Sequence, residues 1–185
     1  MSVFWQHGYA ATSLRDLAQA TGLGAAALYH RFSDKDGLFV EVLRRYAEQG
    51  LRQRLARLAA QPSPVAAIRQ FFDELVELSA TDPHHRGCLL VNTALDGATI
   101  SDAARALVRA RLGELRDFFQ AQLRSADAAG LIAPTVDPAV TAEALLGTVF
   151  AIRVLARLDP DRDRLRRLAD YALAPLTPAK DRTEA

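Results

Sequence analysis

The sequence has little of what marks several large classes of protein. Its 185 residues contain a single cysteine, Cys88, which excludes an internal disulfide framework and fits a reducing compartment. No apolar run approaches the roughly 20 residues that a membrane-spanning helix needs. The N-terminus has no basic region followed by an apolar stretch, so no secretory signal is expected. The sequence therefore predicts a cytoplasmic protein that does not enter a membrane.

Signals for β-strands are equally scarce. There is no sustained alternation of apolar and polar residues and no Asn-Gly hairpin turn. Half of the residues are hydrophobic and 24% are charged, which is the balance of a folded globular chain. Ala, Leu, Arg, Glu and Gln dominate, and their apolar members recur at helical spacing. We expect an all-α fold.

The sequence also lacks the signatures of catalysis. We find no Ser/His/Asp arrangement with a sharp glycine turn, no glycine loop suited to phosphate, and no carboxylate pair with a reason for a shifted pKa. His84 and His85 are adjacent, so their side chains diverge, and no further Cys or His cluster lies nearby. We therefore expect no enzyme, no metal site and no cofactor.

Charge is distributed unevenly along the chain. Residues 1–60 hold eight Lys/Arg and five Asp/Glu, a net charge of +3, whereas residues 61–185 hold fifteen and seventeen, a net charge of −2. The basic third lies at the N-terminal end, where it suits a nucleic-acid contact. The asymmetry is too small to establish one by itself.

Apolar periodicity and capping residues predict a series of helices. A Ser13 cap opens the first and Gly22 ends it, and the segment Gln61–Pro64 is the best linker. We expect helices over residues 13–21, 25–32, 35–60, 64–80, 88–97, 101–128, 138–158 and 162–173.

The first two of these helices and the glycine-containing turn between them form a helix-turn-helix pattern. The second begins with Ala25, Ala26 and Ala27, whose small side chains would let a helix approach the major groove closely. Tyr29 and His30 can donate hydrogen bonds to phosphate. Arg31 has the same chemistry, although solvent or a local ion pair is the simpler assignment for it, and an exposed surface histidine is the simpler reading of His30.

The stretch HGYAATSLRDLAQATGLGAAALYHRFSDKDGLF, residues 7–39, resembles the DNA-binding domain of the TetR/AcrR family of bacterial repressors. The opening G-Y-x-x-T-S, the central L-A-x-x-x-G and the closing L-Y-x-x-F-x-x-K all match in register. The resemblance implies a helix-turn-helix domain over residues 1–47 and a ligand-binding and dimerisation domain over residues 48–185.

The same resemblance assigns the DNA contacts. It places the phosphate contacts at Thr12, Ser13, Tyr29, His30 and Lys35, and the base-facing positions at Gly24, Ala25, Ala26 and Ala27. Members of the family often carry polar residues at the base-facing positions, whereas this chain has glycine and alanine. We therefore expect it to read DNA through methyl contacts to thymine and through DNA shape.

The family's first helix begins about a dozen residues earlier than this chain allows, and only VFWQHGY precedes the motif. On this comparison we expect the core side of the helix-turn-helix to be poorly covered at Leu14, Leu17, Leu28 and Phe32. Two alternatives follow: a DNA-binding repressor, or a dimeric ligand-binding protein whose DNA binding is impaired.

Aromatic and polar residues of the larger domain are candidates for a ligand cavity between helices, which the resemblance favours because such repressors bind a small effector there. The alternative for the phenylalanines is ordinary core. The candidate set is Phe71, Phe72, Leu75, Cys88, Leu89, Asn92, Thr93, Asp96, Phe118, Phe119, Phe150 and Arg153. Arg153 would need an acidic partner if it pointed inward, either Asp96 or a ligand.

Cys88 follows His84, His85 and Arg86 at an expected helix start. Positive neighbours and a helix N-terminus favour a thiolate, so Cys88 is a candidate sensor of thiol-reactive compounds. A small buried apolar residue is the simpler alternative.

The last two helices predict a dimer interface. Small and apolar residues recur along them, and the family dimerises through such a pair of helices from each subunit. The expected interface residues are Leu145, Val149, Ile152, Leu165, Leu168 and Ala172. The sequence as a whole predicts a homodimeric regulator that binds double-stranded operator DNA and is released by a small-molecule effector.

Overall fold

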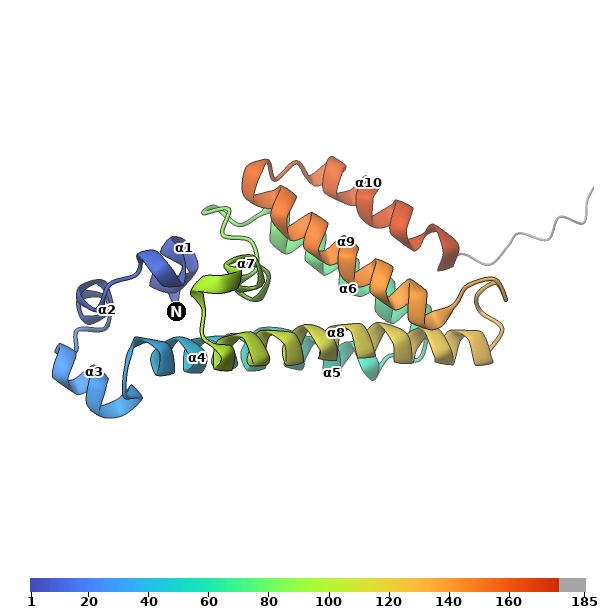
Figure 1. Cartoon of the computed structure of the whole chain (residues 1–185). Coiled ribbons are helices and arrows are strands. Elements are labelled where there is room, and N and C mark those ends of the chain that lie inside the picture. Colours follow the sequence, from blue (N-terminus) through green and yellow to red (C-terminus); the bar gives the residue numbers. More distant parts are fainter. Residues whose placement is uncertain (177–185) are drawn as a thin grey trace, which may run out of the picture. The chain divides into compact units, whose positions relative to one another are not determined.

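The computed structural model describes residues 1–176, and for Ala25, Tyr29 and Ala98 it describes the backbone alone. Every regular element in that range is a helix (Figure 1), so the predicted all-α fold is confirmed. The elements are α1 (Ser2–Ala11), α2 (Leu14–Thr21), α3 (Ala25–Phe32), α4 (Lys35–Tyr46), η1 (Ala47–Arg52), α5 (Gln53–Ala59), α6 (Pro64–Ala80), α7 (Leu89–Leu95), η2 (Gly97–Thr99), α8 (Asp102–Ala128), α9 (Pro138–Leu158), α10 (Arg162–Leu173) and η3 (Ala174–Leu176).

The chain divides into two compact units. Unit 1 comprises Met1–Arg52 and Cys88–Leu112, and unit 2 comprises Gln53–Gly87 and Gly113–Ala185. Helix α7 and the first part of α8 therefore cluster with the N-terminal helices, although the resemblance assigned them to the C-terminal domain. Two of the three crossings between units occur within continuous helical chain, one between η1 and α5 and one inside α8.

Unit 1 has one hydrophobic core to which α1, α2, α3, α4, α7 and α8 all contribute. Each fully buried large side chain of this kind contributes about 1.5–3 kcal/mol to folding. The buried members are Phe4, Leu17, Leu28, Phe39, Leu43, Ala47, Leu89, Leu90, Ile100, Ala104 and Val108.

The first helix contributes three aromatic side chains to this core, Phe4, Trp5 and Tyr9, and two of their rings meet Phe39. Phe4 is 1% exposed, and its ring centroid lies 4.9 Å from that of Phe39. The ring centroid of Tyr9 also lies 4.9 Å from that of Phe39. Gly8, with φ of 76°, interrupts the helix between Phe4 and Tyr9. With the backbone kinked at Gly8, the rings of Phe4 and Tyr9 both pack against Phe39 of α4.

The expected lack of cover over the helix-turn-helix is therefore wrong at two of its four positions. Leu17 is 4% exposed and Leu28 is 3% exposed, because α1 and α4 close over them within the shared core. Leu14 and Phe32 are half-buried and pack against the edge of the same core.

The long helix expected over residues 35–60 is present but not uniform. Between α4 and α5 the chain forms the π-helix η1, so one helical run contains three segments. A π segment widens the turn, and in proteins such segments are short and often stand at functional positions. Here it ends at Arg52, where unit 1 gives way to unit 2.

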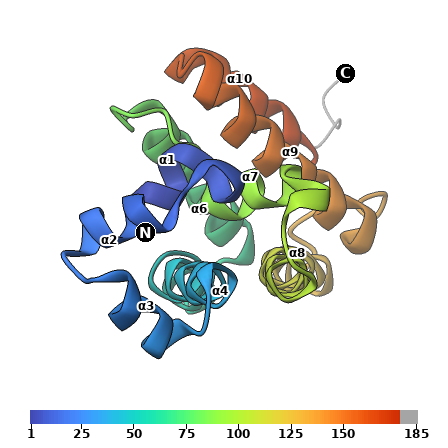
Figure 2. The same ribbon diagram turned by 60° about the vertical axis from the view of Figure 1, so that its left-hand side comes forward.

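Unit 2 is a helical bundle with an aromatic centre. Phe71 and Phe72 of α6 and Phe119 of α8 are at most 2% exposed. The ring of Phe71 meets that of Phe119 edge-on at 5.1 Å, and the ring of Phe72 stacks on it at 5.8 Å. Helices α6, α9 and α10 pack against one another (Figure 2).

Helix α9 is an exception to the expectation that no apolar stretch is long enough to span a membrane. It has 21 residues, and an 18-residue window reaches a mean hydropathy of 1.7, so by length and composition alone it fits a membrane span. Leu145, Val149 and Ile152 nevertheless face the interior of unit 2. Since α9 packs on α6 and α10 and 28% of that window is buried, it is a partly buried helix of the bundle.

Candidate nucleic-acid interface

Helix α2 begins with a complete capping box. The Ser13 hydroxyl accepts from the backbone N–H of Asp16, and the Asp16 carboxylate accepts from the backbone N–H of Ser13 at 2.8 Å. The Asp16 carboxylate also accepts from the Ser13 hydroxyl at 2.6 Å, and the two hydrogen bonds that it accepts from Ser13 lower the pKa of Asp16 below its ordinary value. The helix ends at Gly22, whose φ of 68° is the left-handed conformation that glycine adopts without strain. Both ends agree with the sequence prediction.

The outer surface of helix α3 combines the small side chains of Ala26 and Ala27 with those of His30 and Arg31. Its inner side is anchored by Leu28, which lies in the core. Ala26, Ala27 and His30 are exposed, as are Gly24 in the preceding turn and Ser13 at the start of α2. Of the predicted contacts, the side chains of Ala25 and Tyr29 lie outside the described part of the chain. Gly24, Ala26 and Ala27 suit close approach to a groove because few atoms project from them.

The junction between α3 and α4 depends on a close backbone contact. Ser33 adopts a φ of 68°, and Asp34 caps α4 by accepting from the backbone N–H of Gly37 at 2.7 Å. A Cβ atom at Gly37 would lie 2.2 Å from the carbonyl oxygen of Phe32, so only glycine fits. The turn therefore holds α3 at a set angle to α4.

Lys35 has internal partners that the sequence did not predict. Its ammonium group donates to the carbonyl oxygens of Tyr9 and Thr12, both at 3.0 Å. It also lies 4.3 Å from the centre of the Tyr9 ring. Two of its three N–H donors thus serve the end of α1, where carbonyls lack helical partners. The phosphate contact predicted for Lys35 stays a prediction, with one donor left for it.

Thr12 differs from the expectation. Its side chain is 1% exposed, and its hydroxyl donates to the carbonyl oxygen of Gly8 at 2.7 Å. A side chain so covered does not present its hydroxyl to a phosphate in this conformation. Its structural role is to close the end of α1.

One basic hollow beside α3 was missed in the sequence. Arg31 and Arg45 line a space of about 420 Å³ together with Phe32, Gly37 and Glu41. Two guanidinium groups near the recognition helix suit the phosphate backbone of DNA. The two arginines are fourteen residues apart and on different helices, so no local pattern pairs them.

The residues predicted to bind an effector fall into both units. Phe71, Phe72, Leu75, Phe118, Phe119, Phe150 and Arg153 belong to unit 2, whereas Cys88, Leu89, Asn92, Thr93 and Asp96 belong to unit 1. Within unit 2 the phenylalanines at 71, 72, 118 and 119 are buried and in ring contact. Asp96, which the sequence predicts as a candidate acidic partner of Arg153, belongs to unit 1, whereas Arg153 belongs to unit 2.

Cys88 is half-buried and precedes α7. The Tyr46 hydroxyl donates to its sulfur at 3.7 Å. His84 and His85 are exposed. No cluster of three potential metal ligands occurs within residues 1–176.

The predicted dimer residues lie largely inside unit 2. Leu145, Val149, Ile152 and Leu165 are at most 4% exposed, because α9 and α10 turn this side toward the chain's own core. Leu168 and Ala172 are half-buried. The large apolar side chains that these helices do expose are Val140, Leu158 and Tyr171.

The geometry defines a class of protein: a helix-turn-helix DNA-binding regulator with a helical C-terminal bundle. Residues 1–42 match the family "Bacterial regulatory proteins, tetR family", and residues 64–172 match "Tetracyclin repressor-like, C-terminal domain". The chain belongs to the tetR family of transcriptional regulators, which are not enzymes.

Individual relatives cover nearly the whole chain. The HTH-type transcriptional repressor ComR of Escherichia coli (strain K12) is 30% identical over 174 residues, which are 94% of this chain and 83% of ComR. A structure of the regulator CifR, a cysteine mutant complexed with 26-base-pair operator DNA, is 32% identical with a TM-score of 0.83, covering 93% of this chain and 90% of CifR. AibR, solved in complex with isovaleryl coenzyme A and operator DNA, is 26% identical with a TM-score of 0.73, covering 96% and 93% of the two chains.

Proposed function

We propose that this regulator is a cytoplasmic, homodimeric repressor whose hold on operator DNA is released when a small molecule binds. The exposed face of α3, with Ala26, Ala27 and His30 beside the capped start of α2 at Ser13, is the observation that carries the DNA-binding part. The covered core beneath it supports an intact DNA-binding head, since Leu17 and Leu28 are buried. We therefore favour the repressor over the alternative with impaired DNA binding.

Release by an effector is supported by the relatives and by the helical connections. The relative AibR was crystallised in complex with isovaleryl coenzyme A and operator DNA. In this chain two crossings between the units run through helix, at η1–α5 and within α8. A helix transmits a displacement better than a flexible loop, so a ligand that favours one arrangement of the units changes the DNA affinity.

A gel-shift assay with DNA from upstream of the protein's own gene and of its neighbours tests the DNA-binding part. Ala27→Glu places a negative charge on the exposed face of α3 and is expected to weaken operator binding at least about a hundredfold by repulsion from phosphate. Ala121→Glu is the matched control, because Ala121 is also exposed but lies on α8 in unit 2. Equal binding by both variants would contradict the assignment of α3.

Cys88 is a candidate for release by thiol-reactive compounds. The half-buried sulfur is next to the hydroxyl of Tyr46 within unit 1, so an added group would press on the residues that pack around it. A thiol reagent is expected to lower operator affinity in the wild type and to have no effect on Cys88→Ser. A normal response by Cys88→Ser would exclude this route.

A further inference from the structure

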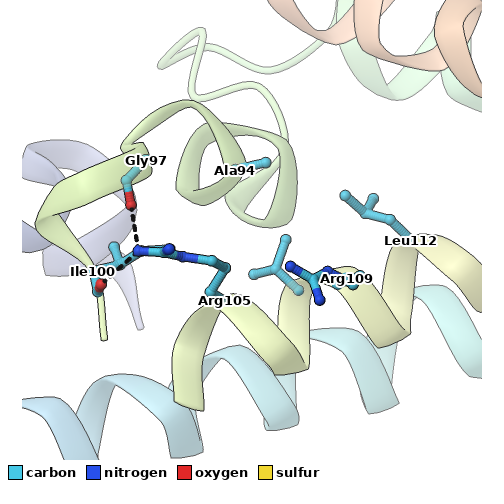
Figure 3. A pocket seen from close by; sticks show the side chains of 7 residues that line it. Ala94, Gly97, Ile100, Arg105, Arg109 and Leu112 are labelled. Atoms are coloured by element: carbon cyan, nitrogen blue, oxygen red, sulfur yellow. Dashed lines mark hydrogen bonds between the residues drawn. The ribbon is translucent and has the colours of Figure 1, made fainter. Parts of the chain in front are cut away.

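A second feature of unit 1 lies apart from α2 and α3. Helix α7, the turn η2 and the N-terminal part of α8 line an open hollow of about 310 Å³ (Figure 3). That volume is at the small end of ligand pockets and equals about ten water molecules at ~30 Å³ each. None of its lining residues stood out in the sequence.

The lining combines an apolar floor with two guanidinium groups. Ala94, Ile100, Val108 and Leu112 supply the apolar surface, and α8 adds Arg105 and Arg109, one turn apart. An apolar surface binds the hydrocarbon part of a ligand, and a cationic side chain beside it binds an anionic group of the same ligand.

The two arginines differ in what they already bind. Arg105 turns toward η2, where it donates to the carbonyl oxygens of Gly97 at 3.2 Å and Ile100 at 3.4 Å. Arg109 has no ion pair and no hydrogen bond from its side chain in the described part of the chain. Its guanidinium lies between Arg105 and Leu112 in Figure 3. Arg109 is thus the cation available to a ligand, while Arg105 shapes the wall.

We propose that this hollow binds a small amphipathic anion: a carboxylate with an aliphatic or aryl body of about ten non-hydrogen atoms in all. The carboxylate pairs with Arg109, and the body covers Val108 and Leu112. We propose further that the bound anion weakens operator binding, a part that rests on the repressor function proposed above.

The link to DNA binding comes from shared side chains. Ile100 and Val108 line the hollow and also belong to the buried core that contains Leu17, Leu28 and Phe39. Those three side chains hold α2, α3 and α4 in place. Since a packed core responds to small shifts at its edge, a ligand seated on Ile100 and Val108 acts on the support of the recognition helix.

Calorimetric titration without DNA tests the site itself. The probes are octanoate and 4-phenylbutyrate, with octan-1-ol as the uncharged analogue. We expect one carboxylate per chain, and binding of octan-1-ol at least about tenfold weaker, since it lacks the charge-assisted hydrogen bonds. Absence of binding by both carboxylates at millimolar concentration would overturn the proposal.

Two variants locate the binding. Arg109→Gln is expected to weaken octanoate binding at least about tenfold, whereas Arg124→Gln, an exposed arginine further along α8, is expected to leave it unchanged. Ala94 is exposed on α7, so Ala94→Phe fills the hollow without burying a larger side chain in the core, and should abolish binding with little change in thermal stability. Wild-type affinity in either Arg109→Gln or Ala94→Phe would place the ligand elsewhere.

Operator binding in the presence of octanoate tests the coupling. We expect octanoate to weaken operator binding by the wild type and to have no effect on Ala94→Phe. Unchanged operator affinity of a chain that binds octanoate would overturn the coupling. A wild-type chain that binds octanoate but no operator at all would overturn the repressor function and leave the binding site standing.

Discussion

At the scale of single residues, Lys35 joins two helices that are distant in sequence. Its ammonium group closes the carbonyl end of α1 at Tyr9 and Thr12. We predict that Lys35→Met, which keeps the length but removes the donors, lowers the free energy of unfolding by about 1–3 kcal/mol because two carbonyls lose a charged partner. Urea denaturation measures this, and Lys35→Arg is the charge-preserving comparison. A Lys35→Met variant as stable as the wild type would contradict this structural role.

A second prediction at this scale compares two glycines, one in a crowded site and one with open space around it. At Gly37 a Cβ atom would lie 2.2 Å from the Phe32 carbonyl oxygen, whereas at Gly50 nothing lies within 4 Å. Gly37→Ala should therefore destabilise unit 1 by more than about 1 kcal/mol, because the α3–α4 junction must open. Gly50→Ala, within the helical run, should stabilise by about 0.5–1 kcal/mol. Thermal unfolding of both variants checks the contrast, and the same sign for both would contradict it.

At the scale of elements, Glu74 ties α5 to α6. Its carboxylate accepts from Arg57 at 2.7 Å and from Gln70 at 3.0 Å. Burial raises the pKa of Glu74, but the hydrogen bonds from Arg57 and Gln70 outweigh burial and leave the pKa below its ordinary value. A carboxyl group with a lowered native pKa stabilises the fold above its unfolded pKa, near 4.3, and that contribution is lost as pH falls through the native pKa.

The expected consequence is that the effect of a mutation at Glu74 on stability depends on pH. Glu74→Gln should cost about 1 kcal/mol at pH 7, a modest value because Arg57 is half exposed, and the cost should shrink toward zero at pH 3. Urea denaturation at both pH values measures the difference. Glu48→Gln, which removes a pair with Arg52 on η1 whose two side chains are both about half exposed, should change stability little at either pH. If Glu74→Gln lowered the free energy of unfolding equally at both pH values, the loss would come from packing and not from the charge of Glu74.

At the scale of the whole molecule, the exposed apolar residues of α9 and α10 bear on the oligomeric state. Val140, Leu158 and Tyr171 are 67–84% exposed, so these large apolar side chains are free to pack against a second subunit. Gly147 is exposed on α9 and has open space around its missing Cβ. We predict that the wild type is a dimer and that Gly147→Arg is a folded monomer, since the chain itself tolerates the new side chain but a close helix partner does not.

Sedimentation measures this prediction directly. Gly113→Arg is the matched control, because Gly113 on α8 also has no atom near its missing Cβ, and this variant should remain a dimer. A monomeric wild type, or a dimeric Gly147→Arg variant, would place the interface elsewhere or exclude it.

The sequence by itself determined the helical class, the ends of α2 and the helix-turn-helix, because these depend on near neighbours: Ser13 caps α2 three residues from Asp16, and Gly22 ends it. Only the tertiary structure decided which side chains remain available to contact DNA, a ligand or a second subunit. It covers Thr12, engages Lys35, buries Leu145 and Val149 within their own unit, and brings Arg109 to an apolar hollow. Those outcomes depend on packing between segments far apart in the chain, and a local pattern of residues carries no information about which distant partner a side chain will meet.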